Sequence, residues 1–338
     1  MLSNCSGSFM KSIILGASGY GGGELFRWLS QHPTIESIEG TSRTNAGKPV
    51  SSIHPNLLGI VDQLFLETID WAQYKNEKAL VVFASMPHGE FKGQYPSLED
   101  EWKRLGLSER ILLIDLSHDF RIHPGFVYGL SEINADQIRG SRRISNPGCF
   151  ATALQLGMLP LAPYSPDQIF VSAVTGSSGS GASASSTTHH PTRSNDFRAY
   201  KMLSHQHEEE VLHSCAQKGW KPRLSFVPHS SSLVRGIFAT IQLTQNDSMK
   251  DLDIPGIFRD FYKDKFFIRC VEGTPRILST VGSNFADLSV ITQNDKVLIM
   301  VALDNLGKGM AAQAIQNMNL ALGLPEWTGL RQAGPYPL

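Results

Sequence analysis

The chain has 338 residues, enough for two domains of ordinary size whose cores need neither disulfides nor metals. Its 30 lysines and arginines against 31 acidic residues give a formal charge of −1, so there is no basic excess of the kind that binds nucleic-acid phosphates. No apolar run of about 18 residues is present, and the first ten residues are too polar for a secretory signal. We therefore expect a cytoplasmic protein that binds neither nucleic acid nor membranes.

Short apolar runs dominate the first part of the chain. Residues 1–10 are set aside as a tail, and the runs at 12–15, 35–40, 80–83 and 111–116 predict buried strands with helices between some of them. This alternation is typical of a doubly wound α/β domain.

A glycine-rich turn follows the first of these strands. The glycines fall in the pattern Gly16-x-x-Gly19-x-x-Gly22, and a helix is expected directly afterwards. Small residues let a phosphate pair approach the amide groups of a helix N-terminus, although the same turn could serve packing alone.

The residues after the second strand bear on which dinucleotide would bind. Where an acidic residue would hold the ribose hydroxyl of NAD, the chain reads Thr41-Ser42-Arg43, and a cation with hydroxyls favours NADP. Glu39 is an objection, but it lies inside the predicted strand, and Arg43 could also be a solvated loop cation.

A cysteine stands at the start of an apolar helix near the middle of the chain. Asn146-Pro147-Gly148 forms a sharp turn, and Cys149 falls on the first turn of the helix that follows. Making thiolate the majority form at neutral pH needs a pKa shift of about two units, nearly 3 kcal/mol, and a helix dipole typically supplies about 0.3 to 1 kcal/mol. A second activating group is needed, and a histidine is the best candidate. Cys215 and Cys270 lack such a turn, and the scattered cysteines indicate neither a zinc site nor a disulfide framework.

Beyond residue 160 the pattern changes to longer alternating runs at 168–174 and 236–243, which predict antiparallel strands of an α+β domain. The Ser- and Gly-rich stretch 176–188 follows a strand directly and is interpreted as a binding loop rather than a linker. A final helix is predicted at 311–322, and its docking site is open.

The second half also supplies candidates for acid–base and anion-binding roles. Histidines occur at 189–190, 205, 207, 213 and 229, and we favour the pair His205 and His207, which precedes a run of glutamates at a helix start. No ligand cluster accompanies the pair, so no metal is assigned. Any anionic substrate would need cations, and the candidates are Arg121, Lys201, Arg235 and Lys308.

Taken together, these motifs resemble the N-acetyl-gamma-glutamyl-phosphate reductase family of arginine biosynthesis and its near relative, the lysine-pathway reductase of carrier-bound aminoadipyl phosphate. The resemblance spans about residues 11 to 330 and rests on segments 16–20, 41–43, 87–89, 115–121, 128–132, 146–152, 200–201, 205–207 and 304–309.

The resemblance implies a Rossmann-type NADP-binding domain of residues 11–148 and 305–338, and an α+β catalytic and oligomerisation domain of residues 149–304. The second domain would be of the semialdehyde and glyceraldehyde-phosphate dehydrogenase type, and the protein a homodimer or homotetramer. The resemblance assigns Cys149 as nucleophile and His207 or His205 as base. Together with Gly16 of the turn, it puts these residues near NADP: Ser18, Gly19, Tyr20, Gly21, Ser42, Arg43 and Asn317.

The expected reaction is the reduction of N-acetyl-gamma-glutamyl phosphate to the semialdehyde and phosphate through a cysteinyl thioester, with Arg121, Lys201 and Arg235 as candidates for binding the substrate. Related acyl phosphates remain alternatives: carrier-bound aminoadipyl, N-succinyl-glutamyl or aspartyl phosphate. So does a non-catalytic NADP-binding regulator. Family members often carry a basic residue in the loop where this chain has Ala182-Ser183-Ala184-Ser185, which leaves open the cation that holds the substrate.

Overall fold

The structure is a computed structural model that describes residues 10–337. All of the expected tail except Met10, the first residue of strand β1, lies outside this range. The described chain forms two compact units, residues 10–147 with Met310–Arg331, and Gly148–Gly309 with residues 332–337.

The chain returns to the first unit at Met310, five residues after the boundary expected at 305. The reason is local, because the carboxylate of Asp304 accepts the N–H groups of Gly282 (2.6 Å) and Leu306 (2.9 Å) and so keeps this segment in the second unit.

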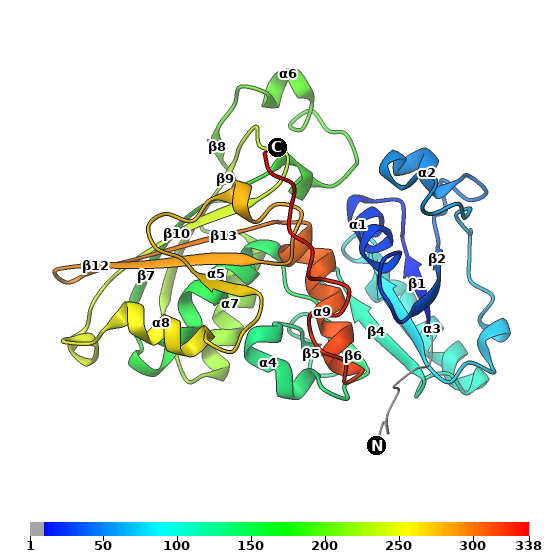
Figure 1. Ribbon diagram of the computed structural model, residues 1–338, viewed down its shortest axis with the longest axis horizontal. Coiled ribbons are helices and arrows are strands. Elements are labelled where there is room, and N and C mark those ends of the chain that lie inside the picture. The colour runs from blue at the N-terminus through cyan, green and yellow to red at the C-terminus, as the bar shows by residue number, and fades with distance from the viewer. Residues whose placement is uncertain (1–9, 338) are drawn as a thin grey trace. The chain divides into compact units, whose positions relative to one another are not determined.

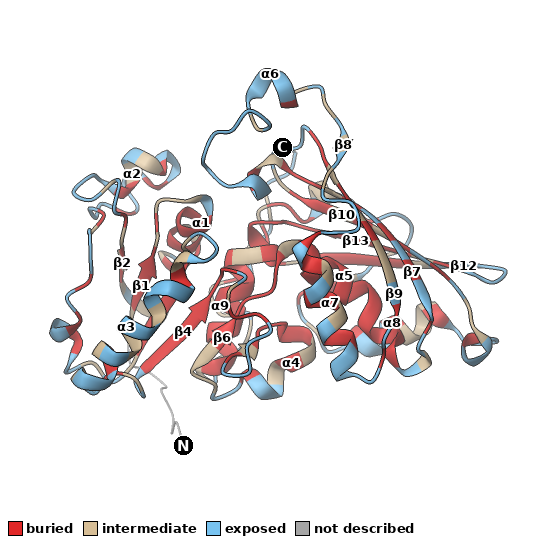
Figure 2. Cartoon of the chain, turned by 180° about the vertical axis from the view of Figure 1, so that it is seen from behind, coloured by how far each residue is buried: buried red, intermediate tan, exposed pale blue. Residues whose placement is uncertain are grey.

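The first unit is built on a six-stranded sheet of order β2-β1-β3-β4-β6-β5, in which every neighbouring pair is parallel. All residues of β3 and β4 are buried, as expected for parallel strands covered on both faces. Figure 2 shows β4 in red. The expected doubly wound sheet is thus confirmed. The strands are β1 Met10–Leu15, β2 Ile35–Gly40, β3 Leu80–Ala84, β4 Ile111–Asp115, β5 Val127–Tyr128 and β6 Arg143–Ser145.

Helices connect these strands and cover the sheet. The C-terminal helix α9, drawn in red in Figure 1, packs on α1, α4 and β4. The helices of this unit are α1 Tyr20–Leu29, α2 Val50–Ile53, α3 Glu90–Leu105, α4 Ser131–Ile138 and α9 Ala312–Ala321.

The second unit contains a seven-stranded mixed sheet of order β11-β12-β13-β10-β7-β9-β8. The expected antiparallel pairing holds between β7 and β10, whereas β7 and β9 are parallel because the chain between them crosses over through α7. The strands are β7 Gln168–Thr175, β8 Arg198–Ala199, β9 Arg223–Ser230, β10 Ile237–Thr244, β11 Ile268–Cys270, β12 Ala286–Gln293 and β13 Lys296–Leu303.

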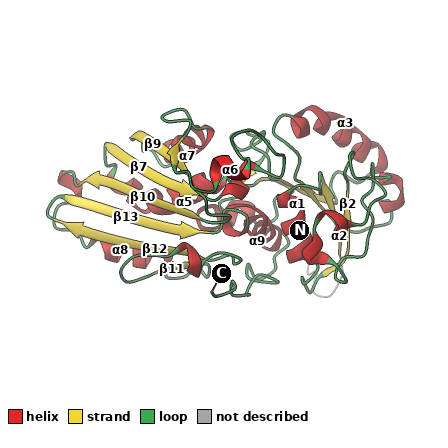
Figure 3. Cartoon of the chain, turned by 90° about the horizontal axis from the view of Figure 1, so that it is seen from above, coloured by secondary structure: helices red, strands yellow, loops and turns green. Residues whose placement is uncertain are grey.

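Helices lie on one face of this sheet. Viewed in Figure 3, the yellow strands lie in front of α5 and α8, and β7 accordingly alternates, with Ile169, Val171 and Ala173 buried and Phe170 exposed. The helices of the unit are α5 Cys149–Met158, α6 His190–Arg193, α7 Gln206–Gln217 and α8 Ile254–Tyr262. Within residues 10–337 no helix is both long and apolar enough to cross a membrane.

Candidate active site

Cys149 is the first residue of α5, as the sequence predicts. Gly148 is the N-cap in an extended conformation, and Cys149 is half-buried. The segment around Gly309 packs closely against Cys149, since a Cβ at Gly309 would lie only 2.7 Å from the Cβ of Cys149. The thiol is therefore held between its own helix and the segment that follows β13.

The N-terminus of α5 is already occupied by a carboxylate. The N–H of Gly148 donates to Oε1 of Glu210, a buried residue of α7, at 2.8 Å. A negative charge at this end opposes the helix dipole, so the dipole alone cannot activate the thiol. A positively charged group must supply the remaining stabilisation of the Cys149 thiolate.

Two imidazoles lie at the start of α7. His205 and His207 are both buried, their rings are 4.6 Å apart, and both pack on Phe150, the residue after the cysteine. Nδ1 of His205 accepts the N–H of His207 at 3.2 Å and so caps the helix. With this hydrogen bond in place, neutral His205 carries its proton on Nε2. His205 is thus committed to the cap, whereas the ring of His207 has no part in it.

Tyr200 lies beside this group, with its ring 5.8 Å from that of His205. Burial raises the pKa of its phenol, and the nearby Cys149 thiolate raises it further. Tyr200 is consequently a neutral hydrogen-bond donor at neutral pH. Its position in the sequence alone indicates no such role.

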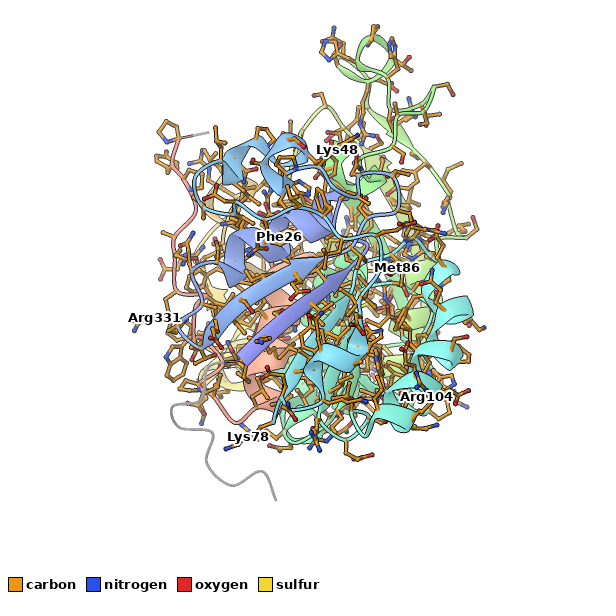
Figure 4. All side chains as sticks on the ribbon, turned by 90° about the vertical axis from the view of Figure 1, so that its right-hand side faces the viewer. Phe26, Lys48, Lys78, Met86, Arg104 and Arg331 are labelled. Atoms are coloured by element: carbon orange, nitrogen blue, oxygen red, sulfur yellow. The ribbon has the colours of Figure 1, made fainter. Side chains whose placement is uncertain are left out.

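The glycine turn of the first unit has the shape that a dinucleotide requires. Gly16 has φ +77° and would clash through a Cβ with Met86, which is labelled in Figure 4. At Gly19, the N-cap of α1, a Cβ would meet nothing within 4 Å, so the helix N-terminus is open to an incoming phosphate. Tyr20 is exposed at the first position of α1, and Ser85 and Met310 fill the space beside Gly21.

The segment after β2 lies against this turn. Ser42 donates its hydroxyl to that of Ser18 at 3.0 Å, and Thr41 accepts the Gly16 N–H at 3.1 Å. Arg43 is exposed and pairs with Glu90. Glu39 acts electrostatically on Lys11 and Tyr74 from within the strand. The turn and the segment after β2 thus lie together, as a dinucleotide site of this kind requires.

Comparison with known proteins agrees with this geometry. Residues 11–141 match the family described as semialdehyde dehydrogenase, NAD binding domain, and residues 149–305 match semialdehyde dehydrogenase, dimerisation domain. A protein of Methanosarcina acetivorans named N-acetyl-gamma-glutamyl-phosphate reductase is 38% identical over 95% of this chain and 98% of its own. One of the same name from Flavobacterium johnsoniae is also 38% identical, over 94% of this chain and 96% of its own.

The chain belongs to the N-acetyl-gamma-glutamyl-phosphate reductase family. The resemblance expected from the motifs is thereby confirmed, and the chain is an oxidoreductase with a nicotinamide-binding domain.

Solved structures of lower identity share the fold. Aspartate semialdehyde dehydrogenase II of Vibrio cholerae, complexed with ASA, has a TM-score of 0.67 at 16% identity and covers 93% of this chain and 98% of its own. The Candida albicans enzyme with NADP has a TM-score of 0.64 at 14% identity, with the same coverage.

The three cationic residues expected to bind the substrate differ in burial and in their partners. Arg121, in the first unit, is buried and donates to the carbonyl oxygens of Asn146 and Leu116. Arg235 forms a two-point ion pair with buried Asp304, with a Nη2–Oδ2 distance of 2.8 Å. Lys201 is exposed, has φ +44° and donates to Gln206. Of the three, only Lys201 is surface-exposed, and a role of any of them in binding the substrate stays a prediction.

Asn317 is held by hydrogen bonds within the first unit. It is fully buried in α9, where its Nδ2 donates to Gly129 (2.8 Å) and Asn146 (3.1 Å) and its Oδ1 accepts from Ser131 (2.7 Å). Both amide protons are used within the first unit. The expected place of Asn317 near the cofactor stays a prediction.

Proposed function

We propose that the protein reduces N-acetyl-gamma-glutamyl phosphate to the semialdehyde and phosphate, with NADPH as hydride donor and Cys149 as the covalent nucleophile. The observation that carries the proposal is the placement of one thiol on the first turn of α5, in the same unit as two buried imidazoles at the start of α7.

The chemistry of this chain's residues runs in two stages. The Cys149 thiolate forms a bond to the acyl carbon, and the bond to the phosphate oxygen breaks with its electron pair leaving on phosphate. The glycine turn would hold the dinucleotide, which when bound would supply the hydride needed to bring the thioester to the aldehyde level. The thiohemiacetal on Cys149 then collapses to aldehyde and free thiolate.

His207 is the better choice for moving protons. His205 uses Nδ1 to cap α7, whereas the ring of His207 is not used by that cap. We assign to His207 the removal of the thiol proton and its return to the tetrahedral species. His205 then holds the first turn of α7, and with it His207, in place.

The reverse reaction tests the proposal directly. With aldehyde, phosphate and NADP as substrates, Cys149→Ser should lower turnover at least about a thousandfold, because the nucleophile itself is removed. Cys270→Ser, at an exposed thiol of the same unit, is the control and should retain activity. Near-normal turnover by Cys149→Ser would refute covalent catalysis here, and a panel of N-acetyl, N-succinyl and unsubstituted aldehydes would define the acyl group.

NADP rather than NAD is proposed on the strength of Arg43, Ser42 and the absence of an acidic residue directly after β2. Arg43→Ala should raise the KM for NADPH about tenfold and leave the KM for NADH unchanged, because only NADPH carries the extra phosphate. Equal changes in both would contradict the assignment.

We also propose that the second unit self-associates through the open face of its sheet. Phe170 and Phe197 are exposed, Phe197 stacks on His229 of β9, and α5 and α8 occupy the opposite face. Phe170→Glu should yield monomers in analytical ultracentrifugation, whereas Phe261→Glu, on an exposed part of α8, should not.

A further inference from the structure

Arg193 is a buried cation in a stretch of polar surface chain. It ends the short helix α6, and its neighbours Pro191, Thr192 and Asn195 are exposed, but Arg193 is only 7% exposed. Its Nε donates to the carbonyl oxygen of Ser231 at 3.2 Å, and its Nη1 donates to the hydroxyl of Ser180 at 3.1 Å.

Both partners of Arg193 are neutral. Among residues 10–337 no carboxylate pairs with it and Nη2 has no hydrogen-bond acceptor. The charged neighbour that acts on it is another cation, Arg198, which pairs with Asp196. Burial, and then Arg198, lower the pKa of Arg193 from its ordinary value. A buried charge without a counter-ion is costly, so a role in binding is the simplest reason for it.

A second arginine of this unit, the partly buried Arg235, shows the contrast. Arg235 has its counter-ion in Asp304, which is itself buried, and the pair is complete without any ligand. Arg193 has no such counter-ion among residues 10–337.

Arg193 also lies in the electrostatic neighbourhood of the nucleophile. The phenol of Tyr200 links the two, because its pKa responds to the thiolate of Cys149 and to the positive charge of Arg193 in opposite directions. Tyr200 in turn packs on His205. An anion held by Arg193 would therefore act on the same phenol as the Cys149 thiolate does.

We propose that Arg193 binds an oxyanion of the substrate in the catalytic unit, with Nη2 donating to the anion and Ser180 and Ser231 holding the guanidinium in place. The inference rests on the proposed function. The chemistry is that of a phosphate or carboxylate oxygen, and an acyl phosphate of an amino acid derivative carries both.

The test separates the two sources of the oxyanion. In the reverse reaction, Arg193→Gln should raise the KM for inorganic phosphate or for the aldehyde at least about tenfold, according to which group it binds, with a smaller change in kcat. Arg193→Lys should restore part of the loss. Arg223→Gln, at an exposed ion pair with Asp167, is the matched control and should leave both KM values unchanged.

Wild-type KM values for both substrates in Arg193→Gln would overturn the inference. If Arg193→Gln fails to fold, Arg193→Lys gives the same decision with a smaller effect, because one ammonium group cannot keep the contacts with Ser180 and Ser231 and also donate to the anion as the guanidinium does. Calorimetric titration with inorganic phosphate and with glutarate supplies a readout independent of turnover. Binding by the wild type that Arg193→Gln loses, without reductase activity in either, would uphold Arg193 and refute the proposed function.

Discussion

Helix α1 follows β1 through the glycine turn, and helix α5 follows β6 through Asn146-Pro147-Gly148, but the two N-termini have different neighbours. At α1 no side chain caps the helix, its first turn carries no acid, and the space beside Gly19 is open. At α5 the carboxylate of Glu210 accepts the Gly148 N–H, and Gly309 closes on Cys149.

The difference follows from what each N-terminus must do. A site for a ligand that comes and goes has to leave its amides accessible, and a dipole there favours phosphate. A nucleophile has to stay in one position, so its turn is packed and capped, and the positive charge it needs comes from other side chains. Under the proposed function, the same local motif would serve binding in one unit and covalent chemistry in the other.

A buried carboxyl group, that of Asp115, lies beside the Asn146-Pro147-Gly148 turn. Its titration gives the largest change in stability that we expect. The main-chain oxygen of Asp115 accepts the N–H of Asn146 at 2.7 Å, and its side chain accepts two hydrogen bonds from Ser117. Burial raises the pKa of Asp115 to about 6, partly offset by those hydrogen bonds. The folded state therefore binds the proton more tightly than the unfolded state does.

The sign of the pH dependence follows. The contribution of Asp115 to stability is complete below its unfolded pKa of about 4 and is lost as the pH rises through about 6, by roughly 3 kcal/mol. In urea unfolding, Asp115→Asn should therefore gain about that much relative to the wild type between pH 4 and 7. Asp136→Asn, at an exposed residue, should follow the wild-type curve. Parallel curves for Asp115→Asn and the wild type would contradict the raised pKa.

Filling the space beside the Cys149 thiol should lower the catalytic rate. Gly309→Ala puts a methyl group 2.7 Å from the Cβ of Cys149, and a displacement of about 1 Å at the reacting atom can lower kcat about a hundredfold. Gly93→Ala in α3, where a Cβ meets nothing within 4 Å, is the control and should stabilise the fold by about 0.5 to 1 kcal/mol. Wild-type kcat in Gly309→Ala would mean that the thiol can move without loss.

Local sequence patterns predicted the strands and the two turns well. The apolar runs at 35–40 and 80–83 became β2 and β3 within one residue, and Cys149 starts α5 as expected. These features depend on neighbours in the chain, and apolar periodicity and glycine record them directly.

Partners distant in the chain were not predictable in the same way. Arg193 lies in the polar run HPTRSND, typical of a surface loop, and its burial depends on Ser231, 38 residues away. Arg235 reads as a free cation until Asp304, 69 residues later, is placed beside it. The composition of α9, however, could have predicted that this helix is buried. Residues 311–322 contain four amide side chains and no charge, and an uncharged amide face indicates a buried helix with polar partners.

The open end of α1 gives the smallest but most specific test of the comparison. Gly19→Ala adds a methyl group to free space and has an ordinary φ of −80°, so it should cost about 1 kcal/mol or less in stability as an N-cap change. If the phosphates of the dinucleotide approach this point, NADPH affinity measured by fluorescence titration should fall about tenfold. Gly22→Ala in the same turn should instead destabilise the fold, because its Cβ would lie 2.2 Å from the carbonyl oxygen of Ala17. Undiminished NADPH binding by Gly19→Ala would mean that the open N-terminus of α1 is not the phosphate site, since a ligand seated on those amides could not avoid the added methyl group.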